Sequence, residues 1–155
     1  LLSKSRLDWQ KSLTNKLNYW NKTFLDIEYA ELIFAWVNLG CLVEGTIKLA
    51  LSVFKEDYLK SSDKIIKGKK ISSPDEIELD RLRIFSNGKL WDKSSKWNDW
   101  ILHIQQRRNA IHAFKDRDLG SFSEFYEDLA KYLEFLIMIN VLLPYPDVTL
   151  YPTIK

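Results

Sequence analysis

The stretch LIFAWVNLGCLVEGTIKLALSVF, residues 32–54, decides the fold. Its apolar residues recur at the three- and four-residue spacing of a helix face, and Ile33, Phe34 and Val37 widen that face. An apolar stripe this broad predicts a helix over about residues 26–59 that is buried by several neighbours. Gly40 and Gly45 each cost such a helix about 1 kcal/mol relative to alanine. Close helix–helix approach explains them, and a kink is the alternative.

The sequence patterns on either side of this stretch also predict helices. An amphipathic face precedes it, made of Trp9, Leu13, Leu17, Trp20 and Phe24. Residues 60–73 predict a loop, followed by a helix that starts after Ser73-Pro74 and stops at Asn87-Gly88. A further helix is expected over about residues 94–113. Ser121 and Glu124 form a capping box that opens a last helix, which must end near Pro144.

The composition supports an all-α fold. The chain has 155 residues with only 5 Gly and 4 Pro, too few turn residues for a β-sandwich or barrel. We therefore predict an up-and-down bundle of four to five helices. The bundle forms one domain over residues 1–143, and residues 144–155 form an irregular tail after Pro144.

Charge and cysteine content exclude several classes of function. The net charge is +2, so the whole molecule shows no strong bias towards nucleic acid. One cysteine, Cys41, allows no internal disulfide, and with two histidines it makes no common zinc site, so we expect neither metal nor cofactor. We expect Cys41 to be buried and inert. The longest charge-free apolar run, residues 32–43, is too short to cross a bilayer, and no signal segment opens the chain. A cytoplasmic location without membrane contact is therefore expected.

The run QQRRNAIHAF, residues 105–114, joins arginine, amide and imidazole groups at the end of an apolar helix. Arg108 and His112 are four residues apart and share a helix face, and Asn109 borders it. Arg107 is five residues from His112 and reaches the same side only where the last turn unwinds. Guanidinium binds phosphate and imidazole moves protons near neutral pH, which suits metal-free phosphodiester cleavage. The alternative is a surface cluster that caps the helix carbonyls, and the residues alone favour that alternative.

Arg107-x4-His112 resembles the Arg-x(4–6)-His signature of the HEPN superfamily, which also lies late in a helical bundle, just before its final long helix. Residues 42–48 resemble the glutamate-centred stretch on an early long helix of that superfamily. The resemblance implies a metal-independent endoribonuclease that acts as a homodimer, with two copies of the motif facing each other across one cleft. It implies RNA as the substrate and a toxin, phage-defence or stress-response setting, with an antitoxin or other protein as a possible partner.

Carried over, the resemblance makes Arg107 and His112 the catalytic pair. Family members often have asparagine directly after the arginine, whereas Arg108 stands there and Asn109 follows. Either Arg108 supports Arg107, or the register is shifted and Arg108-Asn109 is the matching pair. Glu44 either orients one of these groups or pairs with Lys48, four residues on.

The remaining candidates are weaker. Lys115 and Arg117 follow the motif and are expected to contact the RNA backbone. His103 is interpreted as a residue at the edge of the core and is left out of the site. The lysine-rich segment 60–70 is interpreted as a solvated loop rather than an RNA contact. A non-catalytic module that binds nucleotide, RNA or protein through the same groove is the alternative function.

Overall fold

The computed structural model describes residues 7–20, 29–112 and 117–144. It is an all-α helical bundle with one short two-stranded sheet in the described ranges. The elements in chain order are α1 (Leu7–Trp20), α2 (Tyr29–Val53), α3 (Lys55–Lys60), β1 (Ile66–Lys67), β2 (Lys70–Ile71), the 3-10 turn η2 (Pro74–Glu76), α4 (Leu79–Ser86), α5 (Trp97–Arg108), the 3-10 turn η3 (Asn109–His112) and α6 (Phe122–Leu142).

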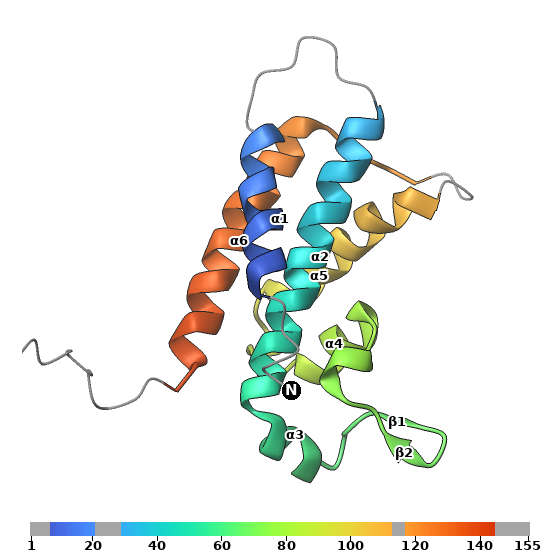
Figure 1. Cartoon of the computed structure of the whole chain (residues 1–155), viewed down its shortest axis with the longest axis vertical. Helices are drawn as coiled ribbons and strands as arrows, with labels where there is room; N and C mark the ends of the chain where they lie inside the picture. Colours follow the sequence, from blue (N-terminus) through green and yellow to red (C-terminus); the bar gives the residue numbers. More distant parts are fainter. Residues whose placement is uncertain (1–6, 21–28, 113–116, 145–155) are drawn as a thin grey trace, which may run out of the picture.

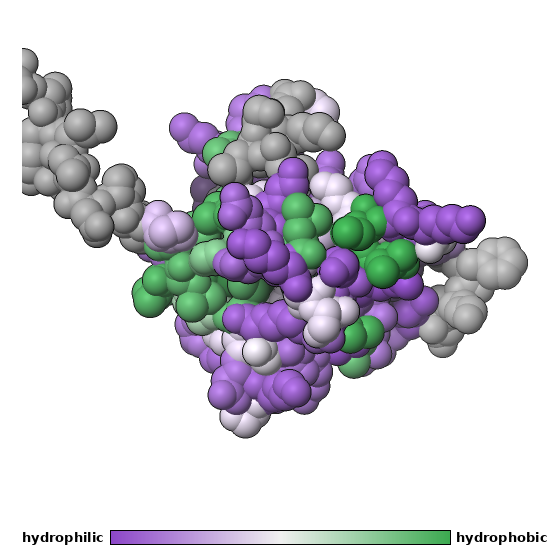
Figure 2. All heavy atoms as spheres, turned by 90° about the horizontal axis from the view of Figure 1, so that it is seen from below, coloured by the Kyte–Doolittle hydropathy of each residue, from purple (hydrophilic) through white to green (hydrophobic). Residues whose placement is uncertain are grey.

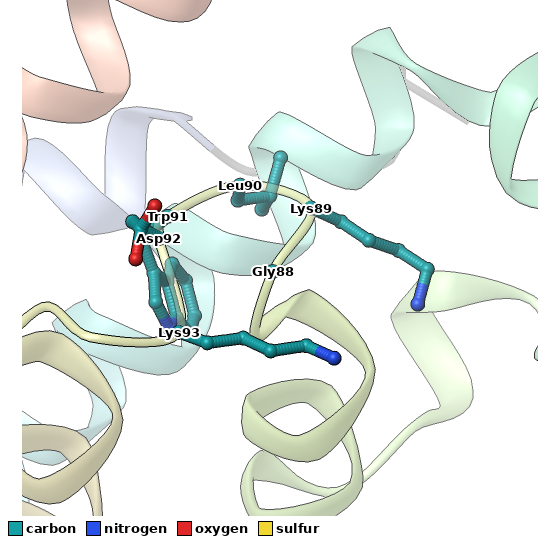
Figure 3. Close-up of a pocket in the computed structure, with 6 residues that line it drawn as sticks. All are labelled: Gly88, Lys89, Leu90, Trp91, Asp92 and Lys93. Atoms are coloured by element: carbon teal, nitrogen blue, oxygen red, sulfur yellow. The ribbon is translucent and has the colours of Figure 1, made fainter.

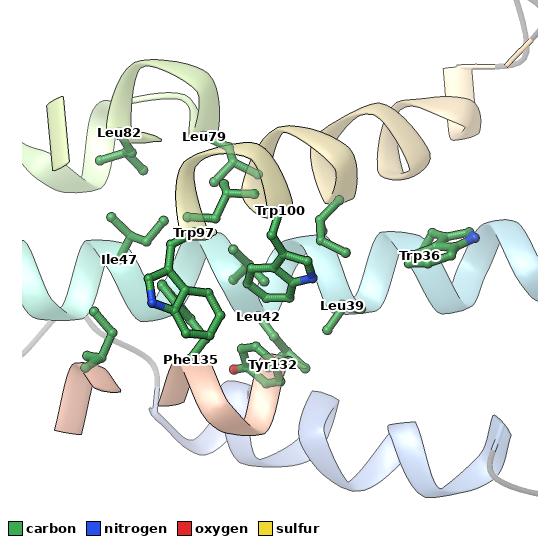
Figure 4. Close-up of a cluster of buried hydrophobic side chains, with 14 of the residues drawn as sticks. Trp36, Leu39, Leu42, Ile47, Leu79, Leu82, Trp97, Trp100, Tyr132 and Phe135 are labelled. Carbon is green, nitrogen blue, oxygen red and sulfur yellow. The ribbon is translucent and has the colours of Figure 1, made fainter. Parts of the chain in front are cut away.

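Helix α2 is the axis of the bundle, as its broad apolar coverage predicts. It packs against α1, α5 and α6 along its length, while α3, α4 and the hairpin gather near its C-terminal end (Figure 1). Trp36, Leu39 and Ile47 of α2 are fully buried. Figure 4 shows the α2 side chains facing those of α4, α5 and α6. Burial on this scale supplies most of the stability of such a helix.

Several boundaries differ from the sequence expectations. The helix expected over residues 26–59 breaks at Phe54, so that α2 ends and the short α3 follows. The Ser73-Pro74 signal opens only the turn η2, without a side-chain cap hydrogen bond, and α4 begins at Leu79. Segment 60–73, expected as a loop, contains the β1–β2 hairpin. Pro74 begins the turn η2, but the residues after Glu76 do not continue this turn as a helix.

The ends of the last helix are as predicted. The Ser121 side chain accepts a hydrogen bond from the amide of Glu124, and the Glu124 carboxylate accepts one from the amide of Ser121, which completes the capping box. Helix α6 ends one residue before Leu143, next to Pro144. On α1, Leu17 and Trp20 are buried, but Trp9 is largely exposed, so the predicted apolar face is only half covered. Phe24 and the tail from residue 145 lie outside the described residues.

Helix α2 is also the one helix of the described residues long and apolar enough to span a bilayer by length and composition. More than half of its most apolar window is buried inside the bundle. Packing against α1, α5 and α6 therefore accounts for much of its apolar character.

Candidate functional site

The candidate site lies at the C-terminal end of α5, where the chain tightens from an α-helix into the 3-10 turn η3. The amide of Asn109 donates to the carbonyl oxygen of Gln105, which closes the last α-helical turn. Ala110 is buried and η3 packs against α2. The predicted run 105–112 is therefore held against the central helix.

Arg107 lies inside the bundle. Its side chain is 6% exposed, its Nη1 atom lies 2.7 Å from Asp118 Oδ1, and its Nη2 atom lies 3.5 Å from Glu124 Oε1. Its guanidinium carbon lies 5.8 Å from the ring centre of Trp36, within reach of a cation–π interaction. The Arg107 guanidinium beside Asp118 lowers the pKa of that carboxyl below its usual range. Arg107 thus ties α5 to the start of α6.

A glycine makes room for this arrangement. Gly120 has a φ of 63°, a left-handed conformation that side chains with a Cβ rarely adopt. A Cβ there would lie 2.8 Å from Nη2 of Arg107. The turn before α6 therefore depends on glycine both for its backbone and for the space that the guanidinium occupies.

Arg108 points to another side of the helix and meets α2. Its Nη1 atom donates to Glu44 Oε2 at 2.5 Å, while Glu44 Oε1 accepts from Lys48 Nζ at 2.7 Å. One carboxylate thus contacts both Arg108 and Lys48, so the pairing with Lys48 is confirmed, while a role of Glu44 in orienting a catalytic group stays a prediction. Burial raises the pKa of Glu44, but the hydrogen bonds from Lys48 and Arg108 outweigh it and leave the pKa lowered. About a quarter of the Arg108 side chain remains exposed, 28%.

Gly40 explains how Arg108 reaches Glu44. A Cβ at Gly40 would lie 2.5 Å from Cδ and 2.9 Å from Cβ of Arg108. The predicted close helix approach is therefore confirmed, between α2 and the end of α5. At Gly45 a Cβ would meet only the end of the Gln10 side chain, at 3.2 Å.

The other predicted residues lie around this end of α5. His112 is exposed at the end of η3, Asn109 is half-buried, and Arg117 is half-buried after the gap in the described residues. Lys115 lies outside the described residues. The structure therefore brings Arg108 and Glu44 together, whereas Arg107 is buried and His112 faces solvent.

A second polar cluster, on α5 and α6, went unpredicted. Asp128 is buried and accepts hydrogen bonds from Trp100 Nε1 at 3.1 Å and Lys131 Nζ at 3.0 Å, and its other oxygen lies 2.7 Å from His103 Nε2. His103 packs edge-on against Trp36, so its interpretation as a core-edge residue is confirmed. Asp128 lies on the buried face of α6, between Phe125 and Tyr132. An acidic residue on this apolar face is the sequence feature that could have indicated the cluster.

This cluster borders a depression of about 350 Å³, whose wall also includes Glu124, Glu127 and Asp99. In the described ranges no group of three or more His, Cys, Asp or Glu side chains is arranged to hold a metal ion. Asp128 already has three donors. The cluster therefore serves to pair a buried carboxylate, as buried charges require.

Cys41 is exposed on α2, so its predicted burial is wrong. It lies on the same face as Glu44 and Lys48, at the three- and four-residue spacing of a helix. The broad apolar stripe of α2 thus extends beyond the part that its neighbours cover.

Comparison of the chain with protein-family models, with curated proteins and with solved structures gives no match.

Proposed function

We propose that the chain is a metal-independent endoribonuclease of the HEPN type that acts in the cytoplasm in a toxin, phage-defence or stress-response setting. The observation that carries this proposal is the pairing of Arg108 with Glu44 next to the turn that presents His112 to solvent. A fixed, partly exposed guanidinium and an exposed imidazole on one helix end are the groups that cleavage of RNA without metal requires.

The proposed roles follow from exposure and partners. A neutral His112 takes the proton from the ribose 2′-hydroxyl, and the 2′-oxygen attacks phosphorus. The bond from phosphorus to the 5′-oxygen breaks, and that oxygen leaves with a proton from the imidazolium of the second copy. Arg108 stabilises the charge that develops on the phosphoryl oxygens, and Glu44 holds the guanidinium in place. Asn109, directly after Arg108, completes the shifted register of the motif.

Arg107 as the catalytic arginine stays a prediction. Its guanidinium already faces Asp118 and Glu124 and is buried, so binding a phosphate there would require these carboxylates to move. Arg108 is accessible without such a change. The shifted register, with Arg108-Asn109 as the matching pair, is therefore the form of the proposal that the contacts support better.

The proposed homodimer would use the face of α2 beside η3. Phe34 and Cys41 are exposed on α2, Val37 between them is half-buried, and all three line a cavity that α1 also borders. Between Phe34 and Cys41 helix α2 itself carries no charge, and Lys16 and Glu31 lie at the edge of the same face. A second copy on this face would lie next to Arg108 and Glu44.

The cleavage test uses purified protein and single-stranded RNA in excess chelator. We expect wild type to cut the RNA and leave 2′,3′-cyclic phosphate and 5′-hydroxyl ends, and His112→Ala to cut at least 100-fold more slowly. His103→Ala is the matched control, since it removes the chain's other histidine, and should keep most of the activity. Equal rates for wild type and His112→Ala, or no cleavage of varied RNAs, would remove the nuclease proposal.

The dimer test uses the single cysteine. Mild oxidation should link two copies through Cys41, because each copy presents it near the axis. In a Cys41→Ser background, Ile137→Cys places an equally exposed thiol on α6 and should stay unlinked at the same protein concentration. Linking through position 137 alone would move the interface to α6 and away from the candidate site.

A non-catalytic module that binds RNA, nucleotide or a protein partner is the second candidate function. The burial of Arg107 between two carboxylates favours it, because this leaves one accessible arginine at the site instead of two. Binding of RNA without cleavage, unchanged in His112→Ala, would be the result that selects this function.

A further inference from the structure

The β1–β2 hairpin carries an unfavourable pair of charges. Lys67 and Lys70 lie directly opposite each other across its two strands, and Lys69 stands in the turn between them. Like charges in this cross-strand position are destabilising. All three lysines are exposed, and within the described part of the chain none forms an ion pair. An anion between the two ammonium groups would relieve this repulsion and so stabilise the hairpin.

The hairpin is held firmly to the bundle. The buried Tyr58 of α3 donates its hydroxyl hydrogen to the carbonyl oxygen of Ser72 at 2.8 Å and accepts from the amide of Ile65 at 3.2 Å. The amide of Ser72 also donates to the carbonyl oxygen of Ile65 at 2.9 Å. One buried hydroxyl thus fixes both ends of the hairpin, so the lysines are presented from a preorganised base.

The loop from Gly88 to Lys93 extends this basic surface. Lys89 Nζ lies 3.0 Å from Asp63 Oδ2, and Lys93 is close enough to contribute to the lowered pKa of Asp63, after the larger effects of Lys89 and Ser62. Figure 3 shows the side chains of Lys89 and Lys93 extending from this loop. Figure 2 looks at this end of the molecule and shows hydrophilic side chains interspersed with hydrophobic patches. Asp92 lies in the same loop between these two lysines, and Asp63 pairs with Lys89.

An aromatic pocket lies beside the same surface. A cavity of about 310 Å³ has an apolar part formed by Leu51, Phe54, Phe85 and Leu90 and a polar part that contains Lys89 and Asp57 with Tyr58 and Ser61. Lys89 Nζ lies 4.5 Å from the ring centre of Phe85. Aromatic walls next to cations are the combination that receives an unstacked base while the backbone stays on the basic groups.

We propose that this basic end, defined by Lys67, Lys69, Lys70, Lys89 and Lys93, binds the phosphate backbone of single-stranded RNA. The choice of RNA as the polyanion rests on the proposed function, whereas the binding surface itself rests on the exposed hairpin lysines Lys67, Lys69 and Lys70. The surface is formed by α3, the hairpin and the loop after α4, and is thus separate from the end of α5. It would hold substrate without taking part in cleavage.

The test measures binding of a fluorescent single-stranded RNA of about 20 nucleotides to the full chain carrying His112→Ala, by anisotropy at several salt concentrations. Lys67→Gln with Lys70→Gln should weaken binding about 5- to 20-fold and flatten the salt dependence of log K by about 1.4, since each lost phosphate contact contributes roughly 0.7. Lys11→Gln with Lys16→Gln, two exposed lysines of α1, is the control for net charge and should change binding less than 3-fold.

Equal losses in both double variants, or no loss in either, would overturn the proposal. Vesicles of phosphatidylserine and phosphatidylcholine form a second arm. Loss of vesicle binding in the hairpin variant with RNA binding intact would overturn it in favour of a membrane surface. Because binding is measured without cleavage, absence of nuclease activity alone would contradict only the proposed function, and loss of RNA binding in the hairpin variant would still support this surface.

Discussion

Arg107 and Arg108 are neighbours in the sequence but belong to two different regions of the molecule. Arg107 lies between α5 and α6, where Asp118, Glu124 and the Trp36 ring surround its guanidinium. Arg108 lies on the outer side of α2, where Glu44 holds it and solvent still reaches it. A shift of one residue along α5 therefore separates a guanidinium at the edge of the core from a guanidinium that a ligand can reach. The comparison shows that, of these two arginines, Arg108 is the one that a ligand can reach.

Removing Arg107 should give the largest change in stability. Arg107→Met loses two ion pairs and the contact with Trp36, and we expect unfolding to become about 2 to 3 kcal/mol easier. This is below the cost usual for a fully buried pair because Asp118 and Glu124 are exposed to water. Arg108→Met should cost under about 1 kcal/mol. Urea unfolding of both variants measures the difference, and equal losses would break the comparison.

The two glycines of α2 give the next largest effect. Gly40→Ala forces a methyl group into Arg108, and we expect a loss of about 1 to 2 kcal/mol, since overpacking outweighs the gain in helix propensity. Gly45→Ala meets only the flexible end of Gln10 and should be neutral or stabilise by up to about 1 kcal/mol. Thermal unfolding of the pair checks this. A stabilised Gly40→Ala variant would show that Arg108 is not held against α2.

The smallest of the three effects concerns pH and the interior cluster. Burial raises the pKa of Asp128, but hydrogen bonds from His103 and Lys131 outweigh it and lower the pKa below the usual 3.8. The charge of Asp128 therefore stabilises the fold above about pH 4, and this contribution is lost as the pH falls through the lowered pKa.

Asp128→Asn should cost about 1 kcal/mol at pH 7 and make the free energy of unfolding less dependent on pH below 4. Urea unfolding between pH 2.5 and 7 measures both. An unchanged acid slope in Asp128→Asn would assign acid sensitivity to other carboxylates.

Much of the fold could be predicted from local patterns. The apolar run 32–54 and the Ser121–Glu124 capping box depend on neighbours in the sequence, and both were placed well. The break at Phe54 and the hairpin at residues 66–71 depend on tertiary contacts, above all the Tyr58 hydroxyl that joins both ends of the hairpin. Such contacts join residues up to 14 positions apart and leave no periodic signal.

The same difference between local patterns and tertiary contacts explains why the candidate site could be predicted only in part. A charge on an apolar helix marked Glu44 as a residue with a partner, which Arg108 and Lys48 supply, whereas the shared face of Arg108 and His112 stays a prediction from their spacing. The burial of Arg107 depends on Asp118 and Glu124, which come from the chain beyond α5, so spacing within one helix could not show it. Exposure of Cys41 likewise depends on which part of α2 its neighbours leave uncovered.

Single-turnover cleavage of one single-stranded RNA, in chelator and at a temperature where all variants are folded, compares the two arginines most directly. We predict that Arg108→Met loses at least 100-fold in rate, whereas Arg107→Met stays within about 5-fold of wild type. Loss of activity in Arg107→Met with full activity in Arg108→Met would contradict the assignment and return the catalytic role to the buried arginine.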